Sequence, residues 1–162
     1  MSTETELAKT LHDFGPEWQR KMVSQAMKGV RAARELAGLP PMPTIVCLCG
    51  STRFKDEINA ANARLTMQGV LVISLGVFGH TDLPDRDWTT GASDDKRMLD
   101  NLHRRKIDLA DEVLIVSDET GYFGESTQGE IRYALEHGKP VKYAVAASEK
   151  RARDLGLIGG AA

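Results

Sequence analysis

Residues 44–53 read Thr-Ile-Val-Cys-Leu-Cys-Gly-Ser-Thr-Arg, a short apolar run that ends at Gly50 and continues into a polar loop. A continuous apolar run of this length is typical of a strand buried on both faces of a parallel sheet. Further apolar runs occupy residues 70–75, 112–117 and 140–145. The segments after these runs predict helices at residues 53–68, 95–110, 126–137 and 148–155.

Strands that alternate with helices predict right-handed βαβ units and a parallel sheet. We therefore predict an α/β fold: a flavodoxin-like or Rossmann-like three-layer sandwich with four to five strands in the order 2-1-3-4-5. In this order the chain changes direction between the first and third strands. Ligands of open α/β sheets bind in the crevice at the carboxyl ends of those two strands.

The N-terminal part of the chain has a different pattern. Residues 16–37 predict a helix, and Pro40, Pro41 and Pro43 predict a stiff connector after it. We therefore divide the chain into an N-terminal helical extension with a Pro-rich connector, residues 1–43, and an α/β domain, residues 44–162. An apolar stripe on the helix is a candidate surface for packing on the main domain or on another chain: Trp18, Met22, Val23, Ala26, Val30 and Ala33.

Composition excludes several classes of protein. The 162 residues carry 23 acidic and 21 basic side chains, a net charge of -2 that argues against a general nucleic-acid binder. No apolar run approaches the roughly 18 residues that span a membrane, and residues 1–10 do not resemble a secretory signal. Cys47 and Cys49 are expected to be small buried hydrophobes of a reduced, cytoplasmic protein. A metal pair is the alternative, but no third cysteine and no suitably spaced histidine completes such a site in the sequence.

Two loops are expected to flank the crevice, and the first follows the first strand. It consists of Gly50, Ser51, Thr52 and Arg53. Glycine allows close backbone approach, and amides, hydroxyls and a guanidinium at the start of a helix suit a phosphate. The alternative is that Ser51 or Thr52 only caps the helix.

The second loop, residues 118–130, ends in a helix that carries Glu130. A carboxylate at the mouth of the crevice could attack a sugar C1 and form a covalent glycosyl-enzyme ester. The alternative is a capping box, Thr127-x-x-Glu130, with Ser126 or Thr127 as the N-cap.

Residues 45–143 resemble the nucleoside 2-deoxyribosyltransferase-like superfamily, which includes nucleoside 5′-monophosphate N-glycosidases. The matching segments are Cys49-Gly-Ser-Thr-Arg53, Ala110-Asp111, Ser126-Thr-Gln-Gly-Glu-Ile-Arg-Tyr-Ala134 and Gly138-Lys-Pro-Val141. The resemblance implies that Glu130 is the nucleophile and that residues 50–53 hold the 5′-phosphate. Ser126 and Thr127 would then lie against the sugar.

The chain departs from the family pattern at a second acid/base position. Family members often carry an aspartate eight residues before the position of Asp111, where this chain has His103. Asp100 and Asp108 lie about one turn to either side, and we take His103 and Asp108 as catalytic candidates. Alternatively, residues 103–106 form a solvated basic face that pairs with these aspartates.

Aromatic residues of two loops complete the candidate site. Tyr122 precedes the helix of Glu130, and Trp88 lies in the long polar loop 76–94. Both are candidates to contact a base; local packing is the alternative for Tyr122, and a simple surface loop or a dimer contact is the alternative for Trp88.

We expect an enzyme that cleaves or transfers the N-glycosidic bond of a nucleoside 5′-monophosphate or deoxynucleoside through Glu130. This chemistry needs no cofactor and no metal. The expected partner is a small nucleoside or nucleotide, without a nucleic-acid polymer or a membrane, and the family tends to form homodimers. The alternative is a non-catalytic nucleotide-binding module in which Glu130 only caps its helix; a weaker one is a phosphoribohydrolase of the lysine-decarboxylase-like type.

Overall fold

The computed structural model describes residues 16–83, 85 and 94–159. The chain divides into two units, with the boundary between Met42 and Pro43. In the first unit, helix α2 runs over Pro16–Leu36. The Arg34 guanidinium donates hydrogen bonds of 3.1 and 2.9 Å to the carbonyl oxygen of Pro40, which holds the Pro-rich connector against the end of this helix.

The second unit is built on a parallel sheet. Its strands are β1 (Ile45–Gly50), β2 (Leu71–Ile73), β3 (Glu112–Val116) and β4 (Val141–Tyr143). They pair in the order β2-β1-β3-β4, which confirms the predicted α/β fold. In register, Cys47 of β1 lies beside Ile73 of β2 and Val113 of β3. Within the described residues the sheet has four strands.

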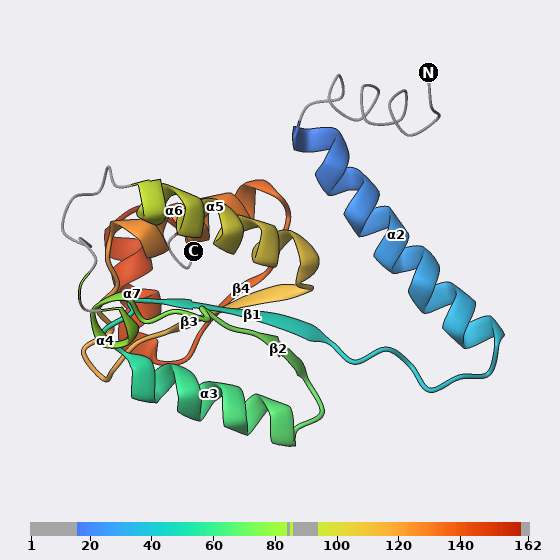
Figure 1. The fold of residues 1–162 in the computed structure, drawn as a ribbon, viewed down its shortest axis with the longest axis horizontal. Coiled ribbons are helices and arrows are strands. Elements are labelled where there is room, and N and C mark those ends of the chain that lie inside the picture. The colour runs from blue at the N-terminus through green and yellow to red at the C-terminus, as the bar shows by residue number, and fades with distance from the viewer. Residues whose placement is uncertain (1–15, 84, 86–93, 160–162) are drawn as a thin grey trace. The chain divides into compact units, whose positions relative to one another are not determined.

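Helices cover both faces of this sheet. They are α3 (Lys55–Met67), the short α4 (Gly79–Asp82), α5 (Asp94–Leu109), α6 (Glu125–Glu136) and α7 (Ala146–Asp154). Helix α3 packs on one face, whereas α5 and α6 lie side by side on the other (Figure 1). Helix α7 contacts β4. The helix α4 lies in a segment that the sequence predicts as loop.

The side chains of β1 alternate between the two faces, because successive residues of a strand point in opposite directions. Val46 and Leu48 belong to the core cluster that also contains Ile58 of α3. Cys47 and Cys49 therefore point to the opposite face, where α5 and α6 pack. Every residue of β1 is buried, as expected for a central parallel strand.

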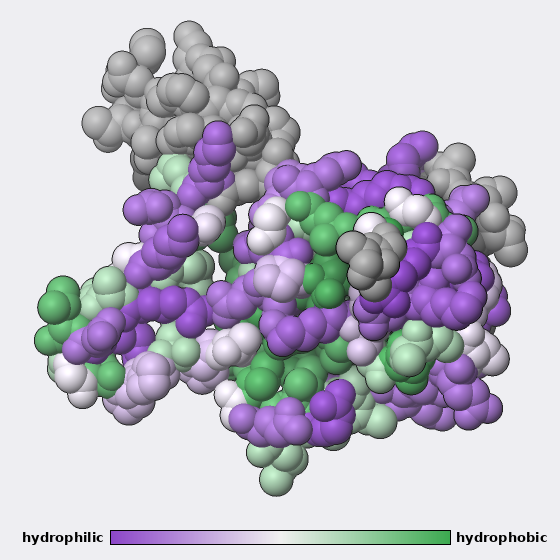
Figure 2. Space-filling model, turned by 180° about the vertical axis from the view of Figure 1, so that it is seen from behind, coloured by the Kyte–Doolittle hydropathy of each residue, from purple (hydrophilic) through white to green (hydrophobic). Residues whose placement is uncertain are grey.

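No helix in the described part of the chain is long and apolar enough to cross a membrane. Hydrophilic residues cover much of the surface seen in Figure 2, and hydrophobic residues are visible between them. The buried hydrophobic residues gather instead around the strands, as in Cys47, Leu48, Val113 and Ile115.

Candidate functional site

A cavity of about 830 Å³ opens at the carboxyl ends of the strands. Its size lies within the range of small-molecule sites. The wall combines the segment after β1, the segment after β2, one side of α5 and the first turns of α6. Lining residues with polar groups include Ser51, Thr52, Lys96, Asp100, His103, Tyr122, Ser126, Thr127 and Glu130. The crevice that the strand order predicts is therefore present, and most of the predicted site residues line it.

Glu130 lies in the second turn of α6 and is only 7% exposed. Its Oε1 is 3.8 Å from Nε2 of His103. Its Oε2 is buried and has no hydrogen-bond partner among the described residues. A buried carboxylate oxygen without a partner is costly, so its presence at a cavity wall indicates a functional role.

The capping-box interpretation of Glu130 is wrong. Helix α6 begins at Glu125, and its N-cap is Gly124, without a side-chain cap hydrogen bond. Thr127 is therefore a helical residue, and its side chain is buried in the cavity wall. Ser126 is helical too, and its Oγ accepts a hydrogen bond of 2.6 Å from Nζ of Lys96.

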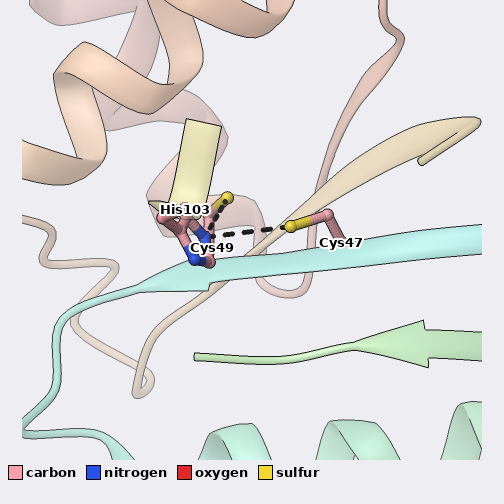
Figure 3. A group of neighbouring side chains, drawn as sticks. All are labelled: Cys47, Cys49 and His103. Atoms are coloured by element: carbon pink, nitrogen blue, oxygen red, sulfur yellow. Dashed lines mark hydrogen bonds between the residues drawn. The ribbon is translucent and has the colours of Figure 1, made fainter. Parts of the chain in front are cut away.

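His103 is buried beside Glu130 and does not belong to a solvated basic face. It is 5% exposed, whereas Arg104 and Arg105, the next residues, are exposed. Its Nε2 lies 3.2 Å from Sγ of Cys49 and 3.8 Å from Sγ of Cys47 (Figure 3). The imidazole thus joins the cavity wall to the two thiols of β1.

Burial of these groups and their proximity to one another shift their pKa values. Burial raises the pKa of Glu130 to about 7, although the charge of His103 opposes this. Burial alone would lower the pKa of His103, but Cys47 and Glu130 raise it above its usual value. A hydrogen bond from Cys49 lowers the pKa of Cys47 to about 6, against the effect of burial. Burial raises the pKa of Cys49 well above its usual value.

The loop after β1 faces the cavity through Gly50, Ser51 and Thr52. Neither hydroxyl caps the following helix, because the N-cap of α3 is Phe54 and it lacks a side-chain cap hydrogen bond. The capping alternative for Ser51 and Thr52 is therefore wrong. Both hydroxyls remain at the cavity wall, where they are suited to an anionic or hydroxylated ligand.

Arg53 does not line the cavity itself. Its guanidinium lies over the ring of Tyr122, 4.6 Å from the ring centre, and the guanidinium of Arg151 lies 5.1 Å from the same ring. Tyr122, which does line the cavity, therefore stands between two cations. Arg53 contributes positive charge beside the cavity, and the predicted direct contact is not supported.

Of the two aspartates that flank His103, Asp100 lines the cavity and Asp108 does not. The Oδ2 of Asp100 accepts a hydrogen bond of 2.9 Å from Lys96. The Oδ1 of Asp108 accepts one of 2.8 Å from the hydroxyl of Tyr133, and its Oδ2 lies 3.2 Å from Arg105. Asp108 thus joins α5 to α6, which corrects its choice as a catalytic candidate. Trp88, the predicted base contact, lies outside the described residues.

One group of neighbouring side chains is not predicted from the sequence. Cys47, Cys49 and His103 offer ligand atoms that all lie within 4.8 Å of one another (Figure 3). His103 thus lies beside the two cysteines in the fold, although no histidine is suitably spaced from them in the sequence. His103 is 54 residues from Cys49 along the chain, so spacing rules for metal motifs do not detect it.

Comparisons with protein-family models, with curated proteins and with solved structures found no match. The function of the cavity is therefore inferred from its own residues: a buried carboxylate, a buried imidazole, the hydroxyls of Ser51 and Thr52, and nearby cations.

Proposed function

We propose that this protein cleaves or transfers the N-glycosidic bond of a nucleoside 5′-monophosphate or a deoxynucleoside. The observation that carries the proposal is the carboxylate of Glu130, buried in the wall of a cavity with one oxygen unpartnered among the described residues. Burial of this carboxylate at a cavity wall supports its assignment as the reacting group. The resemblance of the segment around Glu130 to the deoxyribosyltransferase-like superfamily supports the same role.

In the first step a Glu130 oxygen attacks C1′ of the sugar and forms an ester, while the C1′–N bond breaks and its electron pair leaves with the base. The base takes up a proton, for which the His103 imidazolium is the nearest cavity group to Glu130. Water then attacks C1′, returns its proton to His103 and releases Glu130. When a second base attacks instead of water, the result is transfer.

The loop after β1 suits the 5′-phosphate. Ser51 and Thr52 supply hydroxyl donors, and Lys96 supplies a cation in the same cavity lining. Arg53 and Arg151 add positive charge next to Tyr122. Tyr122 offers a ring against which the base or the sugar can pack. By the same resemblance, we expect the protein to act as a homodimer.

The test is incubation with a panel of nucleotides and nucleosides, with free base resolved by chromatography and a second base added in a parallel set. Glu130→Gln keeps the size of the side chain and removes the nucleophile, so base release should fall by about 10³-fold or more. Glu136→Gln, an exposed position at the other end of α6, is the matched control and should retain the rate.

Full activity of the Glu130→Gln variant would contradict the proposal. Calorimetry that shows tight nucleotide binding without base release from any substrate would contradict it as well. The second result would favour the non-catalytic nucleotide-binding module.

A further inference from the structure

Three donor atoms lie together beside the cavity, and a carboxylate oxygen lies 3.8 Å from one of them. The thiols of Cys47 and Cys49 come from β1, the imidazole of His103 from α5, and the carboxylate of Glu130 from α6. We propose that these groups form a binding site for a thiophilic divalent metal ion, Zn²⁺ by its chemistry, with Cys47, Cys49 and His103 as ligands and Glu130 in the fourth position. This inference goes beyond the proposed function and does not rest on it.

The distances between donors suit a tetrahedral ion. Zinc–sulfur bonds of about 2.3 Å and zinc–nitrogen bonds of about 2.0–2.1 Å place sulfur and nitrogen roughly 3.5 Å apart in a tetrahedron. His103 Nε2 lies 3.2 Å from one sulfur and 3.8 Å from the other. Glu130 Oε1 lies 3.8 Å from the same nitrogen. Cys47, Cys49 and His103 can therefore supply three ligands to one ion, and the distance of 3.8 Å between Glu130 Oε1 and His103 Nε2 places Glu130 next to them.

The backbone holds this arrangement in place. Residues two apart in a strand point to the same face, so β1 directs both thiols toward α5 (Figure 3). Pairing with β2 and β3 on both sides fixes the strand. Ligands that are preorganised by the fold bind a metal without the cost of ordering them.

The donor set also explains why a polar cluster lies in the interior. Cys47 and Cys49 are 0% exposed, yet the imidazole and the carboxylate beside them are polar groups that are costly to bury. Two sulfurs, a nitrogen and an oxygen are typical zinc ligands, and thiolates select zinc over magnesium or calcium. The Oε2 of Glu130 is also buried without a hydrogen-bond partner among the described residues, so this carboxylate has an oxygen that a ligand could satisfy.

The cavity provides access for the ion. His103 and Glu130 line it, whereas the two sulfurs lie behind them. Binding forms two zinc–sulfur bonds, one zinc–nitrogen bond and one zinc–oxygen bond, and it releases to solvent whatever protons the four ligand atoms carry. Because Glu130 then serves as a ligand, a bound ion would block its attack on a sugar; only this consequence rests on the proposed function.

Cobalt(II) titration of the full chain, purified metal-free under reducing conditions, tests the site. Thiolate-to-cobalt charge-transfer absorption reports sulfur ligation, and the chain has only two cysteines, so the signal identifies them. We expect saturation at one ion per chain, tetrahedral d–d bands in the visible range, and loss of both signals when Zn²⁺ displaces the cobalt.

The Cys47→Ala and Cys49→Ala variants should each weaken cobalt binding by more than about 100-fold. His137→Asn is the matched control, because His137 lies at the end of α6, where its ring packs on Tyr133, and this variant should bind as the wild type does. Absence of a charge-transfer band from the wild type would overturn the proposal, as would unchanged binding by folded cysteine variants. If those variants fail to fold, the wild-type spectrum decides alone.

The two proposals fail separately. A cobalt–thiolate signal without base release from any nucleotide would support the metal site and contradict the glycosidase. Base release without a cobalt–thiolate signal would contradict the metal site and leave the glycosidase standing.

Discussion

At the scale of single residues, Gly50 connects the sheet to the cavity. It is the last residue of β1, and a Cβ atom placed on it would lie 2.4 Å from the carbonyl oxygen of Val116 in β3. This oxygen belongs to the backbone, which cannot move away from a new methyl group as a flexible side chain can. The glycine therefore allows β1 and β3 to remain paired up to the point where the ligand loop begins.

We predict that Gly50→Ala lowers the free energy of unfolding by about 1–3 kcal/mol, because the methyl group forces the two strands apart. Gly129→Ala is the matched control: it lies inside α6, and its Cβ would meet nothing within 4 Å. Alanine there should raise stability by about 0.5–1 kcal/mol. Urea unfolding measures both. Equal stability of the Gly50→Ala variant and the wild type would mean that the strands separate there at no cost.

Glu130 and His103 show what single positions in a sequence can and cannot reveal. Glu130 was predicted as a site residue because it follows the third strand near the start of a helix. His103 was predicted only from a departure within the family pattern, and its contact with the cysteines was missed. That contact depends on how α5 packs on β1. Neither the sequence of α5 nor that of β1 predicts this packing by itself.

At the scale of elements, the periodic spacing of apolar residues predicts the strands and helices of the α/β domain. The observed ends of these elements differ from the predicted ends by a few residues. The sequence predicts that the helix of Glu130 starts at residue 126, because Ser126 and Thr127 are residue types that favour the N-cap. The observed helix α6 starts earlier, at Glu125. The helix instead begins after Gly124, whose extended backbone (ψ of -172°) turns the chain into it. Burial of Thr127 in the cavity wall outweighs its local preference for a cap.

The carboxyl end of α5 depends on a lysine from another segment. Nζ of Lys139 donates hydrogen bonds of 3.0 and 2.6 Å to the carbonyl oxygens of Asp108 and Ala110. These carbonyls lie at the end of the helix, where they lack partners within it. Burial lowers the pKa of Lys139, so the ammonium is partly desolvated and depends on these acceptors.

We predict that Lys139→Met lowers the free energy of unfolding by about 1–2 kcal/mol, because two carbonyls lose their donor. Lys142→Met is the control. Lys142 is 61% exposed and pairs with Glu112 at 2.6 Å, a surface ion pair whose loss should cost less than about 1 kcal/mol. Chemical denaturation of the two variants should separate these values. Equal losses would show that the end of α5 is satisfied without Lys139.

The short helix α4 is joined to α3 by a charged pair. Asp82 Oδ1 lies 2.6 Å from Nζ of Lys55, and Asp82 Oδ2 accepts a hydrogen bond of 2.9 Å from the amide of Phe78. The hydrogen bond from Lys55, followed by that from Phe78, holds the pKa of Asp82 below its usual value. The folded protein thus binds this proton more weakly than the unfolded chain does.

A folded-state pKa below the unfolded value of about 3.9 stabilises the protein above that pH, and the contribution disappears as pH falls through the folded-state pKa. We therefore predict that Asp82→Asn lowers the melting temperature at pH 7 and that the difference from the wild type shrinks steadily below about pH 4. Thermal melts across this range measure it. A difference that stays constant with pH would show that the charge of Asp82 has no part in stability.

At the scale of the whole molecule, charge is distributed in a way that the net value conceals. The chain has a net charge of -2, and the cavity lining combines three cations (Lys96, Arg104 and Lys106) with three carboxylates (Asp100, Glu125 and Glu130). A small anionic ligand responds to this local potential and not to the total. The near balance of charge is therefore compatible with a nucleotide site.

The division of the chain at Met42 leads to a last prediction. Every described residue that lines the cavity belongs to the unit that begins at Pro43. A fragment of residues 43–162 should therefore unfold cooperatively and bind nucleoside monophosphates within about twofold of the full chain, since it keeps all of these lining residues. In the helix α2, Met22 and Val30 are each about half exposed (48% and 47%), a surface suited to a second chain. Size-exclusion chromatography should thus show a smaller assembly for the fragment, and calorimetry should show unchanged binding. Loss of nucleotide binding in a folded fragment would show that residues before Pro43 contribute to the site.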